Sequence, residues 1–540
     1  MRVLFYNWVD YLDAERRGGG VSVYQRNLLN ALSDEPGVET VFLASGISYD
    51  LTNNTPRWEQ VRHGPTENAE RRFEIVNSGC LSPGHHSFGH QTQIDHPPTV
   101  ECFFDFIEKN GPFDIVHFNN LEGLPARVLA LKDRFPNTRV IYALHNYYPL
   151  CPQVNLWFQE EQNCRDFDDG RKCTTCLAMR FDVAGVRNAN AVAYNFKRLG
   201  VGPGTLRFDN LFGPSCQVYR HATRQGARFR PSLRAIAQFP DEVAAVPDDS
   251  NGLLTRMEPE YRAFGRRREA FVELMNAHCD RILCVSDRVA QVAARFGLSP
   301  AKLEVAYIGT QQAAKFAETT PRPAMPRPDG TITLAYLGYM RRDKGFYFLL
   351  DALEAMPTHM ARRIKLVVCA RAGDKSTMWR LRNLGGKFAS VRHADGYTHD
   401  NLDRLLEDVD VGVIPVLWED NLPQVAIEMH ARHIPLITSD LGGAKELGNT
   451  ASMVFEAGHI PSFHAIVSDL LSGNFDRDSY WLNAMAPVSM ERHCETLLSI
   501  YRSLGERPAD RAGLGGPTDD GGPEHSVVGA GGAAKVAARA

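Results

Sequence analysis

The stretch that decides the fold is Asp408–Glu446, which reads DVDVGVIPVLWEDNLPQVAIEMHARHIPLITSDLGGAKE. Its apolar run Val409–Ile414 predicts a buried strand. A polar loop follows, and Pro423 then opens a predicted helix, where a proline is favoured because its missing N–H would have no acceptor in the first turn. A second apolar run, Pro435–Thr438, predicts the next strand. A strand, a helix and a strand in this order indicate a unit of a parallel sheet.

The same alternation of short apolar runs and helical patterns extends through the chain in two sets. The runs are Val3–Tyr6, Asp114–Phe118, Val140–Leu144 and Arg281–Val285 in the first set, and Ile332–Leu337, Ile364–Cys369, Val409–Ile414 and Pro435–Thr438 in the second. Strands that are apolar on both faces predict parallel sheets covered by helices on both sides. We therefore predict an α/β protein with two doubly wound, Rossmann-like domains.

The domain boundaries follow from changes in composition. The proline-rich segment around Pro321–Pro328 cannot be helical and predicts a stiff linker. We predict a first domain over residues 1–315, with a Cys-rich loop at about 151–176 and an irregular insertion at about 200–260. The linker covers 316–330, the second domain 331–485, and a helix over 486–504 returns to the first domain. Residues 505–540 have few large apolar side chains and are predicted to be disordered.

Composition limits the class of protein. The 540 residues include 60 Lys and Arg against 64 Asp and Glu, a net charge of −4, which argues against a nucleic-acid-binding protein. No apolar run reaches the roughly 18 residues of a membrane span. The start of the chain becomes polar at Asn7, too early for a secretory signal, and eleven cysteines, an odd number, argue against a disulfide framework. We expect a cytoplasmic enzyme.

Two carboxylates flank the predicted helix start after Val409–Ile414. The first free N–H groups of that helix, at Gln424 and Val425 just after Pro423, suit an anion such as a diphosphate. Asp420 precedes the helix and Glu428 lies one turn into it, so both can face one pocket at the carboxyl edge of the sheet. Carboxylates beside a phosphate site are poor phosphate ligands but good acceptors for sugar hydroxyls.

The Asp420-x7-Glu428 spacing resembles the E-x7-E motif of retaining, nucleotide-sugar-dependent glycosyltransferases of family 4, which have the two-domain GT-B fold. Thr438–Gly443 and Glu446 resemble the downstream loop of the same family. This chain differs in having Asp at the first position, with a side chain one methylene shorter. The resemblance covers about residues 1–200 and 265–500, and it implies two domains that face each other across a cleft.

A second match is the stretch Gly338–Gly345, GYMRRDKG, which resembles the family pattern G-R-x4-K-G. Tyr339 stands where the family has arginine, so the resemblance passes that role to Arg341 or Arg342. Lys344 stands at the position of the family's lysine. Cations and backbone donors at a helix start suit a pyrophosphate.

The first domain carries two further matches. Gly18–Gly20 follows the first predicted strand and resembles the family's glycine-rich loop, so Gly19 and Gly20 are expected near the phosphates or the acceptor. His145 follows the strand Val140–Leu144 and corresponds to the histidine that contacts the donor sugar in this family. From its position alone, a hydrogen-bonded histidine in a partly buried loop is the alternative interpretation.

Four of the cysteines lie within one loop, and two of them have the C-x2-C spacing of metal sites. They are Cys151, Cys164, Cys173 and Cys176. We predict a structural zinc ion bound by these four thiols; the alternative is four independent reduced thiols.

The resemblance implies a glycosyltransferase of the hexosyltransferase type. It would move a sugar from a nucleoside diphosphate sugar to a hydroxyl of a glycan or lipid-linked acceptor, in bacterial surface polysaccharide or lipopolysaccharide biosynthesis. Glu428 would bind the ribose, Asp420 the sugar hydroxyls, and His145 would reach the sugar across the cleft. Because retention in this family is ascribed to front-face attack, no protein nucleophile and no cofactor is expected for the chemistry.

Two other functions remain open at this point. A nucleotide-sugar epimerase on the same architecture would act on the donor alone, and a non-catalytic sugar-nucleotide-binding scaffold would bind the donor without transfer. Arginines such as Arg224, Arg228 and Arg266–Arg268 form either solvated faces or a basic patch that touches the inner membrane surface as a peripheral contact.

Overall fold

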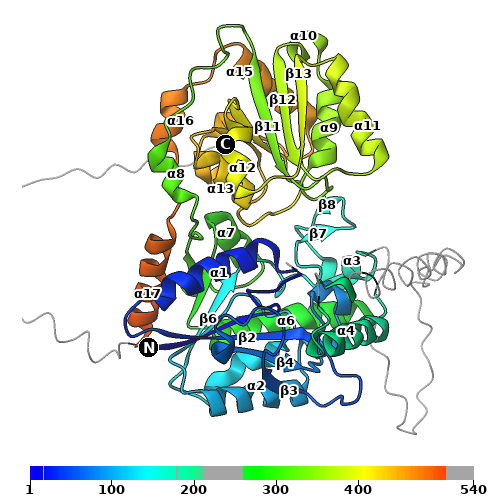
Figure 1. The fold of residues 1–540 in the computed structure, drawn as a ribbon, viewed down its shortest axis with the longest axis vertical. Helices are drawn as coiled ribbons and strands as arrows, with labels where there is room; N and C mark the ends of the chain where they lie inside the picture. Colours follow the sequence, from blue (N-terminus) through cyan, green and yellow to red (C-terminus); the bar gives the residue numbers. More distant parts are fainter. Residues whose placement is uncertain (16, 178–180, 203–204, 208–209, 211–259, 506–540) are drawn as a thin grey trace, which may run out of the picture.

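The computed structural model describes residues 1–15, 17–177, 181–202, 205–207, 210 and 260–505. Almost all of the insertion predicted at about 200–260 and of the tail predicted at 505–540 lies outside the described residues. The described residues form two α/β domains, each built on its own sheet (Figure 1). The predicted α/β class with two doubly wound parallel sheets is confirmed.

The first domain is built on an eight-stranded sheet in the order β10-β9-β6-β5-β1-β2-β4-β3. Its pairings are parallel except that of β3 with β4. Val3 of the central strand lies between Thr40 and Ile115 in the register. The strands are β1 (Arg2–Asn7), β2 (Glu39–Ser48), β3 (Arg57–Gln60), β4 (Arg72–Val76), β5 (Ile115–Phe118), β6 (Arg139–Leu144), β9 (Arg281–Cys284) and β10 (Leu303–Val305).

Helices cover this sheet and lead into its loops. They are α1 (Gly19–Ser33), α2 (Pro97–Asn110), α3 (Arg171–Thr174), α4 (Val183–Arg198), α6 (Glu260–His278) and α7 (Asp287–Arg295). A short hairpin of β7 (Trp157–Phe158) and β8 (Gln162–Asn163) extends from the first domain toward the second (Figure 1). Helix α7 begins where the Ser286 side chain accepts the Val289 N–H, a standard N-cap.

The second domain is built on a six-stranded parallel sheet in the order β13-β12-β11-β14-β15-β16. Its strands are β11 (Ile332–Gly338), β12 (Ile364–Ala370), β13 (Ser390–Asp395), β14 (Val411–Ile414), β15 (Leu436–Ser439) and β16 (Val454–Phe455). Its helices are α9 (Phe346–Ala355), α10 (Thr358–Ala361), α11 (Lys375–Asn383), α12 (His399–Leu406), α13 (Gln424–His430), α14 (Lys445–Gly448), α15 (Ile460–Leu471) and α16 (Arg477–Asn483).

The chain crosses between the domains twice. Helix α8 (Ala313–Glu318) extends into the segment predicted as a linker; the chain has no proline between Pro300 and Pro321 that would prevent a helix there. The last helix, α17 (Met490–Gly505), lies beside α1 of the first domain (Figure 1). Its His493 Nε2 lies 2.7 Å from Tyr24 Oη, and Tyr501 Oη lies 2.6 Å from His117 Nδ1. Among the described residues, no helix combines the length and the apolar character needed to cross a membrane.

Candidate active site

The two domains meet where β6 of the first and β14 of the second end. The side-chain amide of Asn421, in the loop after β14, donates to the carbonyl oxygen of Leu144, the last residue of β6, at 3.0 Å. The carbonyl oxygen of Asn421 in turn accepts from Ser286 Oγ at 2.9 Å. Because Asp420 precedes Asn421 and His145 follows Leu144, this contact brings two predicted site residues to one place.

Lys344 and Asp420 form an ion pair of 2.6 Å between the loops that follow the adjacent strands β11 and β14. Asp420 is buried, and the Lys344 ammonium also lies 5.2 Å from the centre of the Trp418 ring. Gly345 makes this close approach possible. Its φ is +68°, and a Cβ there would overlap the carbonyl oxygen of Pro415. The structure therefore brings together a cation and a carboxylate that the sequence places 76 residues apart.

Glu428 lies on α13 and is buried. Its carboxylate accepts hydrogen bonds from Tyr397 Oη at 2.9 Å and from His399 Nε2 at 3.2 Å. Burial raises the pKa of Glu428, although these two donors and Arg432 oppose the rise. Tyr397 and His399 follow the edge strand β13, and sequence reasoning missed both, since no motif marks them.

The two arginines of the GYMRRDKG stretch lie apart from the Lys344–Asp420 ion pair. Arg341 donates to Asp343 Oδ1 at 2.9 Å, and Arg342 pairs with Glu161 of the β7–β8 hairpin at 3.4 Å. Their side chains are 64% and 60% exposed, so both remain accessible to a ligand. Of the three predicted cations, Lys344 alone contacts Asp420 among the described residues.

The glycine-rich segment differs from the expected loop. Helix α1 begins at Gly19, so Gly19 and Gly20 form its first turn, and a Cβ on Gly18 would overlap Ser22 Oγ. A Cβ on Gly20 would lie 3.6 Å from Gln424 Cγ, at the start of α13. Pro423 directly precedes that helix, and its first N–H groups, at Gln424 and Val425, have no acceptor within the helix. The starts of α1 and α13 therefore face each other across the domain boundary.

His145 is held in the first domain. Its Nε2 lies 3.1 Å from Asn119 Oδ1, and its ring centre lies 5.0 Å from that of Tyr24. Burial, with a smaller contribution from His493, lowers the pKa of His145 to about 3. The imidazole is therefore neutral near pH 7, which suits hydrogen bonding to a hydroxyl. Sequence reasoning missed Asn119 and Tyr24 as its neighbours.

Two glutamates that are not in the predicted site join the domains. Glu419 is fully buried and accepts from Arg288 on α7, from Asn163 and from the Gly442 N–H. Burial alone would raise the pKa of Glu419, but the bonds from Arg288 lower it below its usual range. Glu446 accepts the N–H groups of Asp287 and Arg288 at 2.9 and 2.7 Å. A residue of the second domain thus caps a helix of the first.

The four loop cysteines influence one another electrostatically, but they are not placed as ligands. Cys176 Sγ bonds to Gln153 Oε1 at 3.0 Å. Burial raises the pKa of Cys164 to about 11 and those of Cys173 and Cys176 to about 12. Within the described part of the chain, no group of three or more His, Cys, Asp or Glu side chains could hold a metal ion. As placed, the thiols including Cys151 do not fit zinc, and zinc remains a prediction from the spacing alone.

Comparison with known proteins agrees with this geometry. The family described as "Glycosyl transferases group 1" matches residues 331–473, within the second domain. The chain is a glycosyltransferase of the GT-B fold. Spore coat protein SA of Bacillus subtilis (strain 168) is 23% identical to this glycosyltransferase over 263 residues, which are 45% of the chain and 70% of the relative.

Two solved structures show the same fold over most of the chain. They are HepE of Anabaena in complex with UDP and the lipopolysaccharide outer core galactosyltransferase WaaB in its apo form. Each has a TM-score of 0.51 and 11% sequence identity, and the similarity covers 93% of this glycosyltransferase and 100% of the solved chain. At this identity the likeness supports the fold alone.

Proposed function

We propose that the protein transfers a sugar from a nucleoside diphosphate sugar to a hydroxyl of a glycan or lipid-linked acceptor, with retention of configuration at the transferred carbon. One observation carries the proposal. Lys344 and Asp420 pair at 2.6 Å just before α13, and Glu428 is buried one turn into that helix. A cation for a diphosphate thus stands beside two acceptors for sugar hydroxyls.

Each side chain has a distinct task in this proposal. Lys344, with Arg341 or Arg342, stabilises the negative charge that develops on the departing diphosphate. Glu428 exchanges its bonds from Tyr397 and His399 for bonds from the ribose hydroxyls.

The sugar lies between the two domains. Asp420 accepts from its hydroxyls, and the neutral imidazole of His145 contacts it from the first domain. The acceptor oxygen bonds to the anomeric carbon on the face from which the diphosphate leaves, and its proton passes to a phosphate oxygen. No protein nucleophile takes part in this step.

The relatives support the choice of donor and pathway to test first. HepE was solved with UDP and with UDP and glucose, so a UDP-sugar is the first candidate. WaaB is a lipopolysaccharide galactosyltransferase, and the curated relative is a spore coat protein. These relatives support our proposal that the activity serves the synthesis of bacterial surface glycans, at the cytoplasmic side of the membrane.

A thermal-shift panel of UDP, GDP, TDP, CDP and ADP tests the donor site. A ligand at about 100 times its Kd stabilises the folded state by about 2.7 kcal/mol. We expect one nucleotide to raise the melting temperature of the wild type and not that of Glu428→Ala. Glu407→Ala is the matched control, because Glu407 is exposed in the same domain.

The transfer reaction is then followed with the matching nucleotide sugar. Glu428→Ala should lose transfer, and Glu407→Ala should retain it. NMR of the product should show the anomeric configuration of the donor; an inverted product would refute retention. Transfer at the wild-type rate by Glu428→Ala would refute the assignment of the site.

A further inference from the structure

A buried asparagine connects His145 to the central strand of the first sheet. Asn119 follows β5 and is 0% exposed. Its backbone N–H donates to the carbonyl oxygen of Tyr6, on β1, at 3.0 Å. Its side chain lies between two groups, with Nδ2 3.4 Å from the same carbonyl oxygen and Oδ1 3.1 Å from His145 Nε2. The transfer proposed above assigns no task to Asn119.

These two side-chain contacts fix the direction of the hydrogen bond to His145. A carbonyl oxygen accepts and cannot donate, so the amide nitrogen of Asn119 is the atom that faces Tyr6. The amide oxygen, which also only accepts, then faces His145 Nε2. Because burial lowers the pKa of His145 to about 3, the ring carries one proton near pH 7. That proton is therefore on Nε2, and the lone pair is on Nδ1.

The other ring nitrogen of His145, Nδ1, is the atom left for a ligand. It has no hydrogen-bond partner in the part of the chain that the structure describes. It also differs from His117 Nε2, a polar atom of the same domain that is sealed from solvent without a partner. A ligand can therefore reach Nδ1, and there it meets an acceptor.

The ring is held from a second direction by α1. The Tyr24 ring lies against it, with 5.0 Å between the two centres. Tyr24 is itself fixed from α17, since its Oη lies 2.7 Å from His493 Nε2. The orientation of the imidazole is thus determined before a ligand binds.

His145 lies close to the donor-site loop of the second domain. The side-chain amide of Asn421 donates to the carbonyl oxygen of Leu144, the residue directly before His145, at 3.0 Å. Two residues after His145, burial and nearby negative charges that include Asp420 raise the pKa of Tyr147. Backbone contact and electrostatics thus both place this segment beside Asp420.

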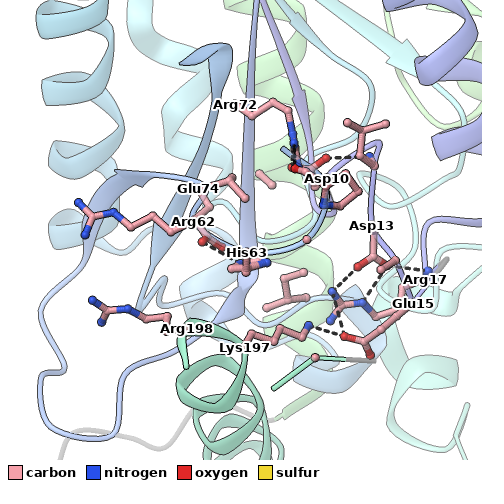
Figure 2. A pocket seen from close by; sticks show the side chains of 18 of the residues that line it. Asp10, Asp13, Glu15, Arg17, Arg62, His63, Arg72, Glu74, Lys197 and Arg198 are labelled. Atoms are coloured by element: carbon pink, nitrogen blue, oxygen red, sulfur yellow. Dashed lines mark hydrogen bonds and ion pairs between the residues drawn. The ribbon is translucent and has the colours of Figure 1, made fainter. Parts of the chain in front are cut away.

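The cavity of the first domain is a separate place. It has a volume of about 370 Å³ and lies between the loop after β1, the strands β2 and β4 and the end of α4. Figure 2 shows its charged side chains facing one another in pairs, such as Arg72 with Asp10 at 2.8 Å. Neither Asn119 nor His145 lines it. A sugar that contacts His145 is therefore expected outside this cavity.

We propose that Asn119 is a positioning residue of the donor site, which holds His145 with its proton on Nε2 so that Nδ1 accepts a hydrogen bond from a hydroxyl of the donor sugar. The inference rests on the proposed sugar transfer. A lone pair on Nδ1 attracts a hydroxyl and repels another acceptor, so the site favours a sugar that presents a hydroxyl there over one that presents a carboxylate. Without the Asn119 oxygen, the proton is free to move to Nδ1, and the same atom would then donate.

Long-range ¹H–¹⁵N NMR of protein labelled with ¹⁵N-histidine reports which ring nitrogen carries the proton, and loss of a signal in His145→Gln assigns it. We expect the wild type at pH 7 to have the Nε2–H form of His145 alone. Asn119→Leu and the smaller Asn119→Ala remove the acceptor and should each show a mixture with the Nδ1–H form. Asn120→Leu is the matched control, because Asn120 is the adjacent buried asparagine and donates to Asn7 instead.

Three results would overturn the proposal without any ligand being added. They are a proton on Nδ1 in the wild type, a pure Nε2–H form in the Asn119 variants, and the same mixture in Asn120→Leu. The last result would mean that general loosening of the loop after β5, and not the loss of one acceptor, releases the proton.

The second experiment compares the nucleotide that binds in the panel with its glucose and galactose conjugates, which are UDP-glucose and UDP-galactose for UDP. We expect a conjugate, and not the nucleotide, to shift the Nδ1 signal of His145. Asn119→Leu should bind the nucleotide as the wild type does and the conjugate about two- to tenfold more weakly, the usual effect of one hydrogen bond. Arg198→Gln, which changes an exposed side chain of the cavity, should bind both as the wild type does.

The nucleotide titration separates failure of this inference from failure of the proposed function. If a nucleotide binds and neither conjugate shifts Nδ1, the role of Asn119 alone is refuted. Weaker binding of the conjugate to Arg198→Gln would place the sugar in the cavity and would also overturn the inference. If every nucleotide of the panel fails to bind, the proposed function fails, and the sugar contact of His145 fails with it.

Discussion

The ion pair between Arg288 and Glu419 is expected to hold the two domains together. Arg288 belongs to α7 of the first domain, and its Nε and Nη2 lie 2.8 and 2.6 Å from the oxygens of Glu419 in the second. Glu419 is 0% exposed. Replacing Arg288 by Met leaves a buried carboxylate without its counter-charge.

The cost of that replacement can be worked out from the burial of Glu419. Removing one partner of a buried ion pair destabilises by about 3–5 kcal/mol. Because the partners belong to different domains, separation of the domains returns Glu419 to water. The penalty therefore falls on the docked arrangement and not on the folding of either domain. At about 1.4 kcal/mol for each factor of ten, the docked population falls about 100- to 4,000-fold relative to the separated one.

Small-angle scattering measures this shift as a larger radius of gyration, and a donor–acceptor dye pair across the domains gives a second readout. Arg288→Met should be more open than the wild type. The double variant Arg288→Met/Glu419→Gln should close again at least in part, since the neutral amide leaves no unpaired charge and its oxygen still accepts from either Gly442 or Asn163. Arg295→Met, at the exposed end of the same helix, is the control. An Arg288→Met protein as compact as the wild type, or a double variant as open as Arg288→Met, would refute the reasoning.

Two further predictions concern stability. Gly345→Ala should destabilise the second domain by about 2 kcal/mol or more, because the added Cβ would overlap Pro415 and displace the loop that carries Lys344. The displaced loop should also bind the nucleotide more weakly. Calorimetric melting with and without UDP measures both effects. Burial alone would raise the pKa of Glu74, but bonds from His63 and Ser48 lower it below its usual value. Its stabilisation is therefore complete above the unfolded pKa of about 4.3 and is lost as pH falls through the lower folded pKa. Urea titrations of wild type and Glu74→Gln from pH 3 to 7 should converge at low pH, and a constant gap would contradict this account.

The central strands of both sheets could be predicted from the sequence, whereas the polar edge strands could not. β1 and β14 are buried along nearly their whole length, and each gives a continuous apolar run. β13, which reads SVRHAD, lies at an edge of its sheet and has no fully buried residue. β3, RWEQ, is at the edge of the first sheet and shows the same partial exposure. A strand that is not buried on both faces has no continuous apolar run, and sequence reasoning based on such runs does not detect it.

The site could be predicted only where its residues lie close together in the sequence. Asp420 and Glu428 lie in one short segment, and their spacing was enough to predict both as candidate site residues. The donors that hold Glu428 lie 29 and 31 residues before it, beyond the polar edge strand that was not predicted. Arg288 is 131 residues from Glu419, and neither has a partner at a spacing that a motif could show. Contacts of this kind are set by the order of the strands and the docking of the domains, which no local pattern contains.

That docking explains why the match to residues 331–473 does not account for the whole site. Lys344 and Glu428 are held by contacts within the second domain. Asp420, in contrast, precedes Asn421, which contacts the first domain twice. The side-chain amide of Asn421 donates to Leu144, and its backbone carbonyl oxygen accepts from Ser286. The Gly443 N–H donates to the Asp420 carbonyl oxygen at 3.0 Å, so the loop is held by the second domain as well. The residues that we propose for the nucleotide are thus held within one domain, while Asp420, which we propose for the sugar, depends on both. If the proposed site is correct, docking of the domains is a step in its assembly, and loss of the Arg288–Glu419 ion pair should lower transfer as well as docking.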